Sequence, residues 1–323
     1  MTKRGYLVVT AIVVILVLAG IVLFTRHAPV PRARHVVVGH LPIVGDLPVF
    51  VAAEKGYFAK QGLDVELVEL HSGNEAINAL VAGKTAMHAT VGSSSLFAAE
   101  AAAPGELKVI LSAEETADKY GAFFITRKGS SISSLEDLKG RKVGTYTGLT
   151  HLLTAKAILA KFMDVETDVE FVQVDPNLQL QALEAGQFDC LFSIEPFPTM
   201  AVEKGIGEVL EENVRAKHLV MPFWAAGMVV TSKLSQDDPA VVNSFVRALE
   251  ESVDFIEAHE QEARAILPKY TGLSESTTAK VHLYRWAKLG EEDRVAAQKL
   301  ADLFHDEGLI PAKISVDSMF YQK

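Results

Sequence analysis

Polar and aromatic side chains cluster in several short stretches of this 323-residue chain, and most of these stretches follow a β-branched or apolar run. Their hydroxyls, amides and imidazoles can donate hydrogen bonds to a ligand, a carboxylate can accept them, and a ring can stack on a planar group. Such residues suit reversible binding of a small polar molecule. The candidate ligand contacts are His40, Pro42, Ser72, Asn74, Ser93, Ser94, Ser95, Tyr146, Thr147, Thr150, His151, Glu195 and Trp224.

Two of these stretches come directly before helix-like runs. Residues 93–95 (SSS) precede LFAAEAAA, and residues 150–151 (TH) precede LLTAKAILAKF. A helix N-terminus offers free N–H groups and the positive end of the dipole, which favours a sulfonate, a carboxylate or nitrate. The same hydroxyls also serve as helix N-caps without any ligand. The convergence of several stretches, and not any one of them, therefore indicates a binding site.

Glu195 and three aromatic residues widen the range of ligands. Glu195 could accept a hydrogen bond from a ligand, which counts against a small bare anion, or it could form a salt bridge between parts of the fold. Tyr146, Phe197 and Trp224 could stack on a ring, because binding sites for organic ligands combine apolar walls with a few aimed polar groups. The expected ligand is a small organic anion or a heterocycle.

Signals for catalysis, metals and nucleic acid are weak. The chain has no G-x-S-x-G elbow and no phosphate-binding P-loop motif, and no two of its 10 histidines are spaced as a metal-binding helix requires. Its single cysteine, Cys190, excludes an internal disulfide and a cysteine-based metal site. The net charge of −10 argues against a nucleic-acid partner. We therefore predict no catalytic residue, metal or cofactor, although His40, His71 and His151 all lie near predicted strand ends.

An internal repeat predicts how these stretches are positioned. VELVELHSGNEAINALVAGK (residues 65–84) aligns with VEFVQVDPNLQLQALEAGQ (169–187), and HVVVGHLP (35–42) aligns with RKVGTYTG (141–148). Each half predicts strands alternating with helices, and Gly83 and Gly186 stand where left-handed C-caps need glycine. This order is typical of parallel βαβ units in two doubly wound sheets, whose ligands bind beyond the carboxyl ends of the strands. We expect the ligand to lie between the two sets of loops.

The N-terminus predicts a membrane segment. Residues 6–24 read YLVVTAIVVILVLAGIVLF without a charge, about 28 Å long as a helix, which matches the hydrocarbon thickness. We expect an uncleaved transmembrane anchor, followed by a stiff tether at residues 27–35, with the rest of the chain on the extracytoplasmic, periplasmic face of the cytoplasmic membrane. A cleaved signal peptide and a soluble periplasmic protein are the alternative. The run is longer than the apolar core of a usual signal peptide, which spans about 7–15 residues, and no clear cleavage site follows it.

Five segments in order resemble a known family: GHLPIVGDLPVFVAAEKGYFAKQGLDVELVEL, GNEAINALVAGK, SSLEDLKGRKVGTYTG, EAGQFDCLFSIEPF and VVNSFVRALEESVDFI. They are similar to the solute-binding proteins of ABC importers, in the subfamily for nitrate, alkanesulfonates, taurine and the pyrimidine precursor of thiamine. The resemblance covers about residues 36–275. It implies a two-lobed α/β type II periplasmic-binding-protein fold with crossovers at residues 121–126 and 226–230. Lobe one would comprise residues 36–120 and 227–323, and lobe two residues 121–226.

The resemblance implies an extracytoplasmic binding component that delivers its ligand to a permease and an ATPase. A ligand-sensing ectodomain without transport is the alternative, and an enzyme on the same fold is a third. Two features depart from the family: Ala86 stands where an aspartate is usual, although the second repeat keeps Asp189, and the expected anchor is unusual. Related pyrimidine synthases of the yeast type carry a cysteine-rich segment, which this chain lacks.

Overall fold

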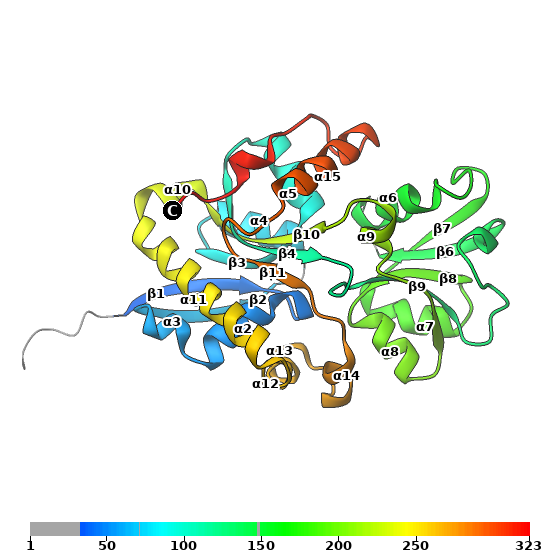
Figure 1. Ribbon diagram of the computed structural model, residues 1–323, viewed down its shortest axis with the longest axis horizontal. Coiled ribbons are helices and arrows are strands. Elements are labelled where there is room, and N and C mark those ends of the chain that lie inside the picture. Colours follow the sequence, from blue (N-terminus) through cyan, green and yellow to red (C-terminus); the bar gives the residue numbers. More distant parts are fainter. Residues whose placement is uncertain (1–32, 71, 147–148) are drawn as a thin grey trace, which may run out of the picture. The chain divides into compact units, whose positions relative to one another are not determined.

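Two mixed β-sheets organise the chain, as Figure 1 shows. The computed structural model describes residues 33–70, 72–146 and 149–323, of which residues 35–323 form one compact unit. The predicted anchor at residues 6–24, as well as His71 and Thr147, lies outside these ranges. Within them, no helix combines the length and apolar character needed to cross a bilayer.

Sheet one has six strands in the order β11-β4-β10-β3-β1-β2. Helices α4, α5 and α15 lie on one face of it, and α2, α3 and α11 lie on the other (Figure 1). A single large apolar core joins both helical layers to the strands. The strands are β1 (Arg34–His40), β2 (Leu63–Glu69), β3 (Met87–Gly92), β4 (Leu107–Glu115), β10 (Phe223–Thr231) and β11 (Arg285–Ala287). The helices are α2 (Leu47–Glu54), α3 (Tyr57–Lys60), α4 (Gly73–Val81), α5 (Ser93–Ala102), α10 (Ser232–Asp237), α11 (Pro239–Ala258), α12 (Glu260–Arg264), α13 (Leu267–Thr271), α14 (Glu275–Lys280) and α15 (Arg294–Asp306).

Sheet two has five strands in the order β7-β6-β8-β5-β9, and it separates two smaller apolar cores. Strand β5 shows why: Ala122 and Phe124 belong to one core, whereas Phe123 and Ile125 belong to the other. This alternation follows from the two-residue repeat of a strand. The elements are β5 (Ala122–Arg127), β6 (Arg141–Tyr146), α6 (Leu149–Leu159), β7 (Val169–Val174), α7 (Gln179–Glu184), β8 (Cys190–Ile194), α8 (Phe197–Glu203), β9 (Gly207–Glu212) and α9 (Val214–His218). Short 3₁₀ helices are η1 (Val44–Asp46), η2 (Glu136–Leu138), η3 (Pro176–Leu178) and η4 (Val316–Met319).

The predicted crossovers are misplaced by a few residues. Residues 121–126 lie almost entirely in β5, and residues 226–230 lie inside β10. The chain instead passes between the sheets at residues 116–121 and 213–222, so the start of β10 belongs to sheet one and not to lobe two as expected. The sheets are also not purely parallel. β1 pairs with β3 and β6 with β7 in parallel, but β5 and β10, the strands that follow the crossovers, pair antiparallel with their neighbours.

The glycine C-caps that the repeat predicts are confirmed. Gly83 and Gly186 follow α4 and α7 with φ of 67° and 69°, the left-handed conformation expected of glycine C-caps. Asp238 caps α11 by accepting a hydrogen bond from the amide of Val241 at 3.2 Å, and Pro239 is the first helical residue. These backbone features depend on neighbours in sequence and are therefore visible in the residues alone.

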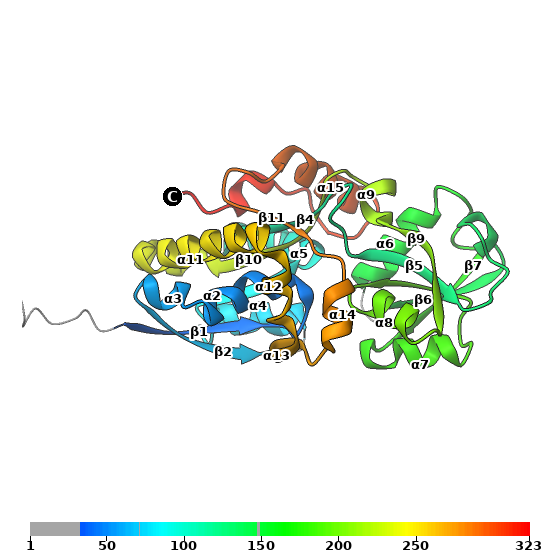
Figure 2. The same ribbon diagram turned by 60° about the horizontal axis from the view of Figure 1, so that its bottom comes forward.

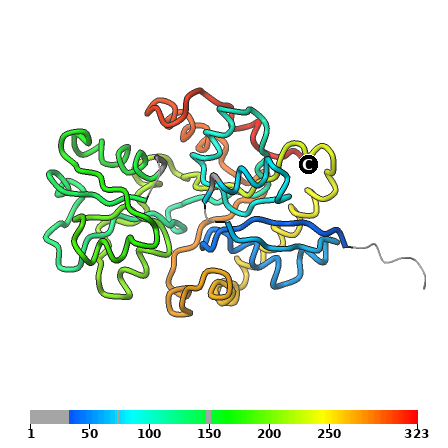
Figure 3. Tube along the Cα trace, turned by 180° about the vertical axis from the view of Figure 1, so that it is seen from behind, coloured from blue at the N-terminus to red at the C-terminus, as the bar shows by residue number. Residues whose placement is uncertain are grey.

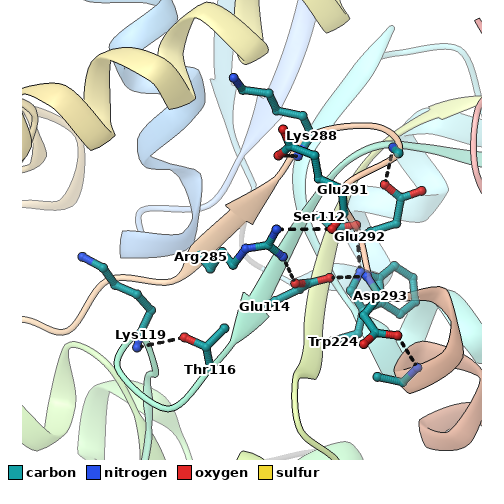
Figure 4. Close-up of polar contacts among 12 residues, drawn as sticks. Ser112, Glu114, Thr116, Lys119, Trp224, Arg285, Lys288, Glu291, Glu292 and Asp293 are labelled. Atoms are coloured by element: carbon teal, nitrogen blue, oxygen red, sulfur yellow. Dashed lines mark hydrogen bonds and ion pairs between the residues drawn. The ribbon is translucent and has the colours of Figure 1, made fainter.

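Two consecutive carboxylates at the end of β4 hold the connections together. Glu115 is fully buried and accepts two hydrogen bonds from Arg215 of the second crossover, at 2.9 and 2.6 Å. It also accepts one from the amide of Gly121, at 2.7 Å. Glu114 is likewise buried and pairs with Arg285, which begins β11 (Figure 4). Because neighbouring residues of a strand point to opposite faces, the two pairs fasten different segments to one strand end.

A third connection joins the C-terminal segment to sheet two. Helix α14 lies beside α8 in Figures 2 and 3, where its segment is orange and α8 is green. Glu203 at the end of α8 accepts hydrogen bonds from Ser276 and Thr277 at 2.7 and 2.6 Å and pairs with Lys280 at 2.7 Å. These hydrogen bonds hold the pKa of Glu203 down to about 2, the Lys280 bond most of all, so the carboxylate stays charged at physiological pH.

Replacing Arg215 with methionine should lower the free energy of unfolding by about 3–5 kcal/mol, because it leaves Glu115 buried without its cation. Urea denaturation measures the change. The matched control is Lys217→Met in the same helix, since Lys217 is 43 % exposed and lies 4.0 Å from Glu211. That substitution should cost less than about 1 kcal/mol. Equal stabilities of the two variants would contradict the structural role of the buried pair.

Candidate functional site

Three aromatic side chains that the sequence analysis names meet at the carboxyl ends of β6 and β8. Tyr146 ends β6 and stacks on His151 of α6, with ring centroids 4.7 Å apart and an interplanar angle of 25°. Phe197 begins α8 and approaches Tyr146 edge-on at 6.3 Å. Tyr146 and His151 lie close together in the sequence, and the structure brings Phe197 to them from the segment that follows the neighbouring strand β8. The group presents apolar ring surface with polar atoms at its margins.

Tyr146 and His151 are both uncharged at physiological pH. Burial raises the pKa of Tyr146 to about 12, and the nearby charge of Asp175 adds to the shift. Burial lowers the pKa of His151 to about 3, helped by the positive charge of Arg215. Both groups can therefore donate or accept hydrogen bonds without carrying charge. Recognition by these two side chains would depend on shape, stacking and hydrogen bonding.

At the end of β1, the structure reveals a residue that the sequence interpretation missed. Asp46 is fully buried, and its carboxyl accepts a hydrogen bond from the amide of Leu41 at 2.6 Å. Burial raises the pKa of Asp46 to about 7, against the opposing effect of Thr90 and of the Leu41 amide. The only signal was a single acidic residue before an apolar helix, which is equally typical of an N-cap. Instead of capping α2, Asp46 folds back and shapes the loop that follows His40.

The other predicted contacts from sheet one differ in their surroundings. His40 is buried at the end of β1, with its ring 5.3 Å from Phe50 and 6.4 Å from Tyr270. Pro42 is partly buried in the loop that follows, and Asn74 lies in α4. Ser72 is an N-cap, because its hydroxyl accepts a hydrogen bond from the amide of Glu75 at 3.2 Å. Ser72 therefore serves as a helix N-cap, a role that needs no ligand.

The three serines after β3 are not N-caps. Gly92 occupies the cap position of α5 and makes no side-chain cap bond, while Ser93, Ser94 and Ser95 form the first turn. Ser93 is buried and the other two are partly buried. In sheet two, the corresponding helix α6 begins at Leu149, so that Thr150 and His151 lie in its first turn. The two helix N-termini thus follow β3 in sheet one and β6 in sheet two, which are not counterparts in the repeat, since β6 corresponds to β1.

Trp224 does not belong to the site. Its side chain is 1 % exposed, and its ring lies 5.3 Å from Phe97 and 5.7 Å from Phe320. The indole N–H donates to the hydroxyl of Ser112 at 3.0 Å, as Figure 4 shows. The predicted stacking role is therefore wrong, since the ring fills the core of sheet one. An aromatic residue near a crossover gives no sequence signal that separates these two roles.

Glu195 joins the two sheets and is not a free ligand contact. It is 2 % exposed, and one oxygen accepts hydrogen bonds from the Thr199 hydroxyl at 2.8 Å and from the His282 amide at 3.0 Å. The sequence analysis offered a salt bridge between parts of the fold as one role for Glu195. The structure shows a contact between such parts, but the partner is the backbone amide of His282 and not a cation. Burial raises the pKa of Glu195 to about 7, while the hydrogen bonds oppose the shift.

Among residues 33–70, 72–146 and 149–323, no group of three or more His, Cys, Asp or Glu side chains is arranged to hold a metal ion. His40 packs against Phe50 of α2, whereas His151 packs against Tyr146 near the ends of the other sheet. Cys190 is a buried core residue, and burial raises the pKa of its thiol.

Comparison with known proteins identifies the family. The family model described as NMT1/THI5 like matches residues 46–263, more than half of the chain. The chain belongs to the NMT1/THI5-like family. A putative aliphatic sulfonates-binding protein of Bacillus subtilis is 26 % identical over 333 residues, covering 99 % of this chain and 96 % of that protein.

The relatives that resemble this chain include an enzyme. A 4-amino-5-hydroxymethyl-2-methylpyrimidine phosphate synthase of Candida albicans is 24 % identical, over 68 % of this chain and 66 % of the relative. Among solved structures, the periplasmic aliphatic sulphonate-binding protein SsuA of Escherichia coli superposes with a TM-score of 0.73 at 18 % identity, covering 90 % of this chain and 92 % of that one. The chain therefore has the two-sheet α/β fold of a periplasmic binding protein.

Replacing Glu195 with glutamine should change how stability depends on pH. The folded state raises the carboxyl pKa from 4.5 to about 7, so it keeps a proton that the unfolded chain releases. In the parent, this contribution is present below about pH 4.5 and is lost as the pH rises through 7. Between pH 5 and 8, Glu195→Gln should therefore gain stability relative to the parent, on the order of 1–3 kcal/mol.

Denaturation of both proteins at each pH measures this difference, in which Asp46 cancels because it is unchanged. Glu106→Gln, at an exposed acidic residue, is the control and should follow the parent curve. A constant stability difference between Glu195→Gln and the parent across the range would show that the carboxyl does not titrate near neutral pH.

Proposed function

We propose that the chain is the extracytoplasmic binding component of an ABC importer, which binds a small organic solute between the strand-end loops of its two sheets and delivers it to a permease. The observation that carries this proposal is the group of Tyr146, His151 and Phe197 at the ends of β6 and β8. Ligands of open α/β sheets bind beyond such strand ends. Relatives named for binding aliphatic sulfonates support a transport role.

Three arginines are already paired with carboxylates of the protein, which favours recognition of the solute by uncharged groups of the protein. Arg215 is committed to Glu115, Arg264 to Glu260, and Arg285 to Glu114. An anionic group on the solute would therefore meet the first-turn N–H groups of α5 and α6, which suit anions. The rings of Tyr146, His151 and Phe197 would cover a planar or apolar part. An organic anion such as a sulfonate and a small heterocycle both satisfy these conditions.

An enzyme on the same fold is the second candidate, and the pyrimidine synthase among the relatives is the observation that favours it. A ligand-sensing ectodomain without transport is the third. Genes for a permease and an ATPase beside this one would support transport over sensing. Chemical conversion of the bound solute by the purified chain would instead support an enzyme.

We further propose that residues 6–24 anchor the protein in the cytoplasmic membrane, with the described chain outside the cytoplasm. A run of 19 uncharged residues should keep the protein in the membrane fraction during high-salt and carbonate washing, because burial of apolar side chains does not depend on salt. Immunoblotting of the fractions measures this. A soluble periplasmic form that begins near residues 28–36 would instead establish a cleaved signal peptide.

Purification from cells under native conditions, followed by mass spectrometry, should release a small organic solute from the chain. Tyr146→Ala should weaken its binding more than removal of any single hydroxyl, because stacking and burial are both lost; Ser94→Ala should cost about 0.5–1.5 kcal/mol, or ~1.5–3 if the solute is charged. Calorimetry measures both values. Ser235→Ala is the matched control, since its hydroxyl bonds to the Ser232 carbonyl in α10, away from the site.

Unchanged affinity in folded Tyr146→Ala and Ser94→Ala would place the solute elsewhere. Loss of affinity in Ser235→Ala to the same degree would show that the losses reflect general destabilisation and not contact.

A further inference from the structure

Helix α14 is attached to sheet one, although it contacts helix α8 of sheet two. The chain enters it from α13, which packs against α2, and continues to β11, an edge strand of sheet one. Arg264 of α12 donates hydrogen bonds to the carbonyls of Thr278 and Val281, at 3.0 and 2.7 Å. Val281 and Leu283, which follow α14, are buried in the apolar core of sheet one. We therefore expect α14 to move with sheet one.

Polar groups make the contact between α14 and α8. Glu203, the last residue of α8, accepts hydrogen bonds from the Ser276 and Thr277 hydroxyls and from the Lys280 ammonium. Ser276 and Lys280 are exposed, and the Glu203 side chain is 17 % exposed. Water can replace these partners without the exposure of apolar surface, so the contact can break and form again at modest cost. We call these four side chains the α14 clasp.

The α14 clasp lies apart from the crossovers between the sheets. In Figures 1 and 2, α14 and α8 lie low in the view, whereas α9 of the second crossover lies above them. A rotation of sheet two about the crossovers therefore changes the distance between α14 and α8. Hydrogen bonds hold only over a narrow range of distances, so such a rotation has to open the clasp.

Helix α8 joins the α14 clasp to the proposed solute site. It begins with Phe197 of the ring group and ends with Glu203, about 9 Å farther along the helix axis. In its first turn, the Thr199 hydroxyl donates to Glu195, which also accepts the amide of His282, two residues after α14. The C-terminal segment therefore contacts sheet two near both ends of α8.

We propose that the α14 clasp holds sheet two in its present position relative to sheet one and opens when the sheets move apart, so that it controls access to the solute site. Three hydrogen bonds to one carboxylate stabilise the clasped state, and the exposure of Lys280 lets water and salt compete with it. The link to solute exchange rests on the proposed function, whereas the movement of the sheets can be tested without a solute.

The test measures the distance between the sheets by double electron–electron resonance in the purified full chain, dialysed to remove small molecules. Spin labels are attached at Ala240→Cys in α11 and Gln181→Cys in α7, both exposed positions, while Cys190 is buried. The parent should give one main distance, with any second distance below about 10 % of the population. Glu203→Ala should raise the ratio of the second population to the first at least about fivefold, because all three bonds are lost.

Lys280→Met provides a second variant, which changes only an exposed side chain. It should shift the populations in the same direction as Glu203→Ala, and the double variant should shift them by less than the product of the two effects, because both changes remove one contact. Glu170→Ala is the matched control. Glu170 pairs with Lys142 at 2.7 Å, the same distance as in the Lys280–Glu203 pair, but both of its partners lie in sheet two. Its distances should match the parent.

Three results would each overturn the proposal. Unchanged distances in both Glu203→Ala and Lys280→Met would show that the clasp does not hold the sheets. An equal shift in Glu170→Ala would show that the effect is not specific to the clasp. Two comparable populations in the parent would show that the clasped state is not held. None of these results depends on a solute, so failure of the clasp is distinguishable from failure of the proposed function.

Discussion

The two carboxylates at the end of β4 are the constraint on which the rest of the structure depends. Glu114 and Glu115 are buried side by side in sequence on opposite faces of one strand, and each needs a cation that its own strand cannot supply. Arg285 comes from the C-terminal segment, and Arg215 comes from the second crossover. Both distant segments must therefore return to the strand end from which the first crossover leaves. The connections between the sheets are defined by this requirement.

The same buried cation influences the proposed site. Arg215 satisfies Glu115, and its charge also helps to keep His151 neutral. Tyr146 stacks on that imidazole. Arg215 of the second crossover therefore links the buried ion pair to the group of Tyr146, His151 and Phe197. Glu195 provides a further link, because its carboxyl accepts the amide of His282 from the C-terminal segment. A solute between the sheets would lie close to polar groups that are already paired with the protein.

Features that depend on neighbours in sequence could be predicted. The left-handed glycines at 83 and 186 and the strand–helix order of each half follow from local patterns. The two-sheet α/β part of the predicted fold was correct for that reason, and the comparison with a solved binding protein agrees with it.

Features that depend on long-range partners could not be predicted. Trp224 and Glu195 looked available for a ligand, but Ser112 and His282, which engage them, lie 112 and 87 residues away in the chain. Asp46 resembled an N-cap, and its true partner follows from the path of a loop. The crossovers were misplaced because the ends of β5 and β10 are decided by pairing with strands of their own sheets.

A crystal structure of the chain with the solute that it carries from cells tests the central claim most directly. The account predicts that the solute contacts both the first turn of α5, at residues 93–95, and the ring group of Tyr146, His151 and Phe197. A solute that contacts only one sheet, or that binds away from both sets of strand-end loops, would contradict it.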